Sequence, residues 1–141
     1  MKSVGAYFPY EEERNRDLWR AFCQIIDSNR GAYLKDIYTK LVNSPSCRFW
    51  VSSDRATTVM SAIMRGESLD DMRPNKREMY MEIYRRVAEE MERHPEESLS
   101  NITFDVVNSP APKFFLTPAS AKLILRKIRK KWYETRRFLK R

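Results

Sequence analysis

Lysine and arginine gather at the C-terminal end of this 141-residue chain, which has a net charge of +8. Residues 1–110 carry slightly more acidic than basic side chains, whereas Glu134 is the one acidic residue after them. Such a single-sign stretch predicts a site for a polyanion, because phosphates attract cations without regard to base sequence. The candidate binding residues are Lys113, Lys122, Arg126, Lys127, Arg129, Lys130, Lys131, Arg136, Arg137, Lys140 and Arg141.

A long helix is expected to present most of these charges. Apolar residues recur at helical spacing after Pro118, and the basic residues fall mainly on the other side. About 22 residues at about 1.5 Å each make a rod roughly 33 Å long, similar to one turn of duplex DNA. We therefore predict a non-enzymatic protein that binds nucleic acid, with DNA as the expected target, through a basic C-terminal helix. The alternatives are a structural or adaptor subunit of a phage or mobile-element assembly that binds an acidic protein partner, and a helix whose charges are merely solvated.

A second candidate site is a turn that occurs twice, 65 residues apart. Asn-Ser-Pro at 43–45 returns at 108–110. Each copy continues with a cation and two aromatic residues, Arg48-Phe49-Trp50 and Lys113-Phe114-Phe115. A cation beside aromatic rings could bind a phosphate and stack on a base. The alternative is that Phe49 and Phe114 fill the core while Arg48 and Lys113 stay in solvent. Arg48, Arg55 and Arg65 are secondary candidates for nucleic-acid contact.

The same repeat predicts the architecture, because residues 34–63 align with 99–128. We expect an all-α fold of two tandem three-helix repeats, repeat one over 13–66 and repeat two over 75–141, after an N-terminal tail over 1–12. A unit of about 50 to 60 residues buries little surface by itself. The two repeats are therefore expected to share a core within one compact domain, 1–141.

Local signals set the expected helix ends. Ser52 and Thr117 stand immediately before apolar helical patterns and are expected to be N-caps, with Pro118 at the first helical position. Asn75 and Glu78 have the spacing of a capping box. The six helices are expected near 15–28, 34–42, 53–65, 76–93, 99–107 and from 118 toward the C-terminus.

Other classes of function find little support. Cys23, Cys47 and the single His94 have no metal-ligand spacing, so we expect neither a metal nor a cofactor, and we interpret the cysteines as buried or half-buried thiols. With three glycines and no phosphate-binding loop, the chain is not expected to be an enzyme. No apolar run has the length of a membrane span and no signal peptide is recognisable, so the expected location is the cytoplasm. The composition is compatible with a homo-oligomer.

Two resemblances bear on these expectations. The order of three helices, the third following a capped turn, resembles helix-turn-helix and tandem Myb-like DNA-binding units, although the connection over 43–52 is longer than the usual three or four residues. That resemblance implies that the third and sixth helices face a DNA groove. The Asn-Ser-Pro-x-x-Arg/Lys-Phe-aromatic pattern, with Ser52 or Thr117 two residues later, is similar to small basic proteins of unassigned function from gut Bacteroidota and their mobile elements or phages.

Overall fold

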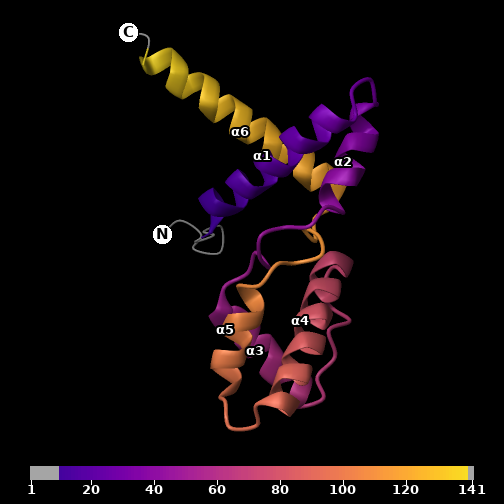
Figure 1. The fold of residues 1–141 in the computed structure, drawn as a ribbon, viewed down its shortest axis with the longest axis vertical. Coiled ribbons are helices and arrows are strands. Elements are labelled where there is room, and N and C mark those ends of the chain that lie inside the picture. The colour runs from indigo at the N-terminus through magenta and orange to yellow at the C-terminus, as the bar shows by residue number, and fades with distance from the viewer. Residues whose placement is uncertain (1–9, 140–141) are drawn as a thin grey trace.

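The structure is a computed structural model that describes residues 10–139 as six α-helices joined by irregular segments (Figure 1). The helices are α1 (Glu11–Ser28), α2 (Leu34–Val42), α3 (Ser53–Met64), α4 (Pro74–Arg93), α5 (Leu99–Val107) and α6 (Pro118–Leu139). Within these residues there is no strand, and one isolated bridge joins Ser46 and Ala111. The predicted all-α fold class is confirmed.

Two of the three predicted caps are present. The Ser52 hydroxyl accepts a hydrogen bond from the Arg55 backbone N–H (3.1 Å) at the start of α3, and Thr117 accepts one from Ser120 (3.0 Å) at the start of α6. The prediction of a capping box at residues 75–78 is wrong, because α4 begins at Pro74 and has no side-chain cap. Proline suits this first position, where the helix needs no N–H donor.

The first helix begins earlier than its apolar spacing predicts. It starts at Glu11 rather than near residue 15, so the tail predicted over 1–12 ends at residue 10, and residues 1–9 lie outside the described part of the chain. Three glutamates fill the first turn of α1, where negative charge interacts favourably with the helix dipole and stabilises the helix. Charge at the helix end therefore extends α1 beyond its apolar stripe.

The helices pack in two groups, one of α1, α2 and α6 and the other of α3, α4 and α5 (Figure 1). Each group encloses its own cluster of buried side chains, so there are two cores where the sequence predicted one shared core. In the described chain α3 makes no contact with α1 or α2, although the three are consecutive. The predicted units 13–66 and 75–141 therefore exchange their third helices.

Two irregular segments, 43–52 and 108–117, connect one group of helices to the other, and each is called a crossing. Ser46 and Ala111 exchange two backbone hydrogen bonds where these segments meet (3.1 and 3.0 Å). The Phe49 N–H donates to the Val107 carbonyl (3.0 Å), and 65 residues later the Phe114 N–H donates to the Val42 carbonyl (3.1 Å). The two crossings thus have equivalent backbone hydrogen bonds.

Neighbouring aromatic residues anchor each crossing in both cores. Phe49 is buried among α3, α4 and α5, whereas Trp50 packs against the core of α1, α2 and α6. In the second crossing the order is reversed: Phe114 packs in the core of α1, α2 and α6, and Phe115 packs in the core of α3, α4 and α5. The neighbouring rings of each segment therefore enter different cores, and at Phe115 the backbone takes a left-handed conformation with a φ of 57°. The interpretation of Phe49 and Phe114 as core residues is confirmed.

Candidate nucleic-acid interface

Helix α6 is packed over its first half and projects over its second. Ala121 and Leu125 are buried against α1 and α2, and Ile128 is partly buried. Beyond Ile128, Trp132 is 52% exposed and Tyr133 is 55% exposed. Figure 1 shows the C-terminal end of α6 extending away from the body of the protein. The second half of α6 is therefore accessible to a partner.

The first candidate residues lie along this helix and are exposed: Lys122, Arg126, Lys127, Arg129, Lys130 and Lys131. Within the described residues none of the six takes part in a hydrogen bond or ion pair through its side chain. Two arginines of α4 differ, since Arg85 pairs with Glu82 (2.8 Å) and Glu89 (2.9 Å), and Arg93 pairs with Glu90 (2.8 Å). The positive charge of α6 is thus left uncompensated.

Two of the predicted binding residues instead hold the crossings. The Lys113 Nζ lies 2.8 Å from Glu78 Oε2, away from the α6 cations. Arg48 donates to the backbone carbonyls of Phe49 (3.0 Å) and Val51 (2.7 Å) and to the Asn108 side chain (3.1 Å). The interpretation of the repeated turn as a phosphate site is not supported, because its cations are already engaged.

The remaining candidates are distributed elsewhere. Arg55 lies on α3 and Arg65 follows it, so both belong to the other group of helices; Arg65 pairs with Glu67 (2.9 Å). Arg136 and Arg137 belong to α6, but their side chains are outside the described part of the structure, as are residues 140–141 entirely.

An open groove of about 1700 Å³ lies between α1 and the second half of α6. Its wall is mainly aromatic and apolar, formed by Trp19, Phe22, Trp50, Ile128, Trp132 and Tyr133. Its α6 side carries Lys127, Arg129 and Lys131, whereas its α1 side carries Glu11, Glu12 and Glu13 together with Arg16 and Arg20. Sequence reasoning missed this groove, because it exists only where α6 packs on the helices of the first repeat.

A buried carboxylate lies beside the groove. Asp17, 5% exposed, accepts hydrogen bonds from the Cys47 N–H (2.8 Å), the Trp50 Nε1–H (3.1 Å) and the Arg20 guanidinium (2.6 Å). Burial acts to raise the pKa of Asp17, but these hydrogen bonds together outweigh it and lower the pKa. Asp17 therefore anchors the first crossing to α1 and orients Trp50 in the groove wall.

The same carboxylate also engages a thiol. The Cys47 Sγ–H donates to Asp17 Oδ1 (3.1 Å), and this hydrogen bond, followed by burial, raises the pKa of Cys47. Cys23 and Cys47 are both exposed, so the interpretation of the two thiols as buried is wrong.

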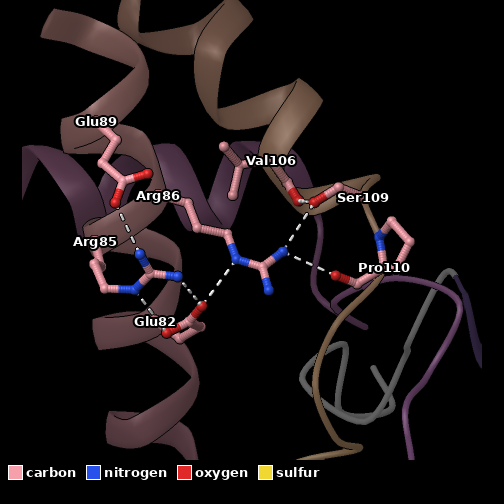
Figure 2. Close-up of polar contacts among 7 residues, drawn as sticks. All are labelled: Glu82, Arg85, Arg86, Glu89, Val106, Ser109 and Pro110. Carbon is pink, nitrogen blue, oxygen red and sulfur yellow. Dashed lines mark hydrogen bonds and ion pairs between the residues drawn. The ribbon is translucent and has the colours of Figure 1, made fainter.

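The second crossing is anchored to α4 (Figure 2). Arg86 donates to the Ser109 hydroxyl (3.2 Å) and to the Pro110 carbonyl (2.8 Å), and its Nε lies 2.8 Å from Glu82. Glu82 also pairs with Arg85, and the Arg85 hydrogen bond is the main reason that the pKa of Glu82 is lowered. The Glu82–Arg86 pair supports a contact between α4 and the crossing.

Neither a search for membrane-spanning helices and metal ligands nor a comparison with known proteins assigns this chain to a class. Over residues 10–139 no helix combines the length and apolar composition needed to span a membrane, and no three His, Cys, Asp or Glu side chains are grouped as metal ligands. No protein-family model matches the chain, and no curated protein or solved structure is significantly similar to it. The fold and the surface of α6 therefore carry the functional argument.

Proposed function

We propose that this protein is a non-enzymatic nucleic-acid-binding protein whose contact surface is the basic face of α6. The observation that supports this function is the row of six exposed cations without acidic partners on a helix that projects from the body of the protein. Unpaired cations lose no internal ion pair when they meet phosphates. Each phosphate contact also releases counterions, which favours association at low ionic strength.

The rest of the fold supplies the support for this surface. Buried Ala121 and Leu125 fix the first half of α6 against α1 and α2, so the basic face has a defined direction. An acidic protein partner is the alternative ligand for the same cations. The two ligands differ in a measurable way, because nucleic acid binds through many equivalent phosphates and its affinity falls steeply and linearly on a log–log salt plot.

The test compares two variants with the same charge change. The α6 variant replaces Lys122, Arg126 and Lys130 by glutamine. The control variant replaces three exposed cations outside α6, Arg30, Lys35 and Lys76, by glutamine. Binding to a labelled oligonucleotide is measured by fluorescence anisotropy from about 50 to 200 mM salt.

The α6 variant is expected to lose about 2 to 3 from the slope of log affinity against log salt, roughly one per phosphate contact removed. The control variant is expected to keep the parent slope. Equal behaviour of the two variants, or absence of binding to single-stranded and duplex oligonucleotides at low salt, would falsify the proposal.

We also infer that the two halves of the chain are tandem three-helix repeats. The equivalent hydrogen bonds of Phe49 and Phe114, and the equivalent caps Ser52 and Thr117, support this arrangement. The repeats differ where the function is proposed, since α3 is far less basic than α6.

A further inference from the structure

The second half of α6 combines cations with exposed aromatic rings. Trp132 and Tyr133 are about half exposed and lie edge to face, with ring centroids 4.8 Å apart. Both line the groove beside α1, and Lys127, Arg129 and Lys131 form the adjoining rim. A cationic track next to stacking surfaces is the arrangement by which proteins hold unpaired bases.

We propose that the groove between α1 and α6 binds single-stranded nucleic acid, with one or more unpaired bases stacked on Trp132 and Tyr133. This inference rests on the proposed function and names its substrate class. The phosphates lie along the α6 cations and the bases turn inward to the aromatic wall. A duplex cannot make this contact, because its bases are already paired and stacked.

The two sides of the groove differ in charge. The α1 side has Glu11, Glu12 and Glu13 together with Arg16, which pairs with Glu12. The α6 side has Lys127, Arg129 and Lys131, so phosphates are attracted more strongly to α6. The backbone of the bound strand is therefore held on the α6 side, and only bases enter between the two helices. The Trp50 ring in the groove wall is also held in place, because its Nε1–H donates a hydrogen bond to Asp17.

The groove is large enough for this occupant. Its volume of about 1700 Å³ exceeds the roughly 300 to 1,000 Å³ of typical small-molecule pockets, and it is open to solvent. An open site allows a polymer to enter and leave without threading an end. Stacking is also tolerant of sequence, since every base has a π face.

The test removes the ring and leaves every charge in place. Trp132→Ala is compared with Leu123→Ala, a matched control on the same helix: Leu123 is 53% exposed and does not line the groove. Affinities are measured at fixed low salt for three probes of equal length: a pyrimidine single strand, a duplex, and an abasic single strand that keeps its phosphates.

The parent protein is expected to bind the single strand more tightly than the duplex. Trp132→Ala is expected to weaken binding of the single strand by about tenfold, the cost of one stacked base, and to leave the duplex and abasic affinities unchanged. Leu123→Ala is expected to change none of the three. Trp132→Tyr, which retains a stacking surface, is expected to recover most of the lost affinity, and the pyrimidine strand is expected to quench the tryptophan fluorescence of the parent.

Other results overturn the inference in distinguishable ways. If Trp132→Ala and the parent bind the single strand equally while the α6 charge variant still shows its reduced salt slope, only the stacking site is lost. If no probe binds, the proposed function is lost with it. If the parent sediments as a dimer that Trp132→Ala converts to a monomer, with unchanged binding per subunit, the groove holds a second copy and not a nucleic acid.

Discussion

Asp17 is buried, charged and fully engaged. Its two oxygens receive hydrogen bonds from α1 itself and from the crossing, so one side chain joins a helix to a segment 30 residues away. A buried carboxylate is costly to leave unpaired, and here three residues, Arg20, Cys47 and Trp50, donate hydrogen bonds to it. The folded protein therefore depends on the ionised form of this residue.

Replacement of Asp17 by asparagine is expected to lower the free energy of unfolding by about 2 to 3 kcal/mol at pH 7, because charged hydrogen bonds are lost in a buried site. The control is Glu12→Gln on the same helix, whose ion pair with Arg16 is largely exposed; its cost is expected to stay below about 1 kcal/mol. Urea denaturation measures both. Equal costs for the two variants would contradict the role given to Asp17.

The same residue predicts how stability depends on pH. The pKa of Asp17 is lower in the folded state than in the unfolded state, where it is about 3.9. Its contribution is therefore complete above that unfolded value and is lost as pH falls through the folded pKa. The difference in stability between the parent and Asp17→Asn is expected to shrink when urea midpoints are measured below about pH 4, and a difference that stays constant down to pH 2 would argue against this linkage.

Cys47 is exposed yet expected to react slowly. Its raised pKa reduces the thiolate fraction, and the thiolate is the reactive form. In a Cys23→Ser background, alkylation of Cys47 by iodoacetamide at pH 8 is expected to be slower than alkylation of an unstructured peptide with the sequence 43–52. Peptide mapping by mass spectrometry gives both rates, and a protein rate that matches or exceeds the peptide rate would count against the Asp17 contact.

At the scale of elements, each third helix stabilises a group made of helices from the other half of the sequence. The Thr117 cap should therefore affect helices that lie about 75 to 106 residues away in sequence. Thr117→Ala is expected to cost about 1 kcal/mol and to speed hydrogen exchange about fivefold in α1 and α2, while α4 and α5 keep their protection.

Ser52→Ala provides the matched control for this prediction. Ser52 caps α3, so its loss is expected to speed exchange in α4 and α5 and to leave α1 and α2 unchanged. Hydrogen exchange followed by mass spectrometry resolves the four helices. Loosening of α4 and α5 by Thr117→Ala would contradict the exchange of third helices.

For the whole molecule, the exchange implies that the two halves stay together without a covalent link. A protease site placed within 67–73, the loop between α3 and α4, allows the folded chain to be cut there. The two fragments are expected to elute as one species in size-exclusion chromatography at micromolar concentration, because each half holds a helix in the core of the other. Separate elution of two folded fragments would contradict this arrangement.

Much of this molecule could be predicted from its sequence, because local signals determine helices. The caps Ser52 and Thr117 and the apolar spacing after Pro118 predicted α3 and α6, which the structure contains. The exchange could not be predicted, since a helix with an apolar stripe fits the core of either half. The roles of Asp17 and Arg86 could not be predicted for the same reason. Their hydrogen-bond partners lie on the crossings, and the path of each crossing depends on which core the third helix joins.

The place of α6 in the core of the first group also determines when that core can close during synthesis. Leu18 and Leu41 leave the ribosome early, but Leu125, which packs in the same core, is translated more than 80 residues after Leu41. At about 5 to 20 residues per second, α1 and α2 wait on the order of ten seconds for this helix. The helices α3, α4 and α5 are contiguous and can assemble meanwhile. The group of α1, α2 and α6 begins to be synthesised before the group of α3, α4 and α5 but is completed after it. A ribosome that stops before α6 releases a chain with one complete core and one open one.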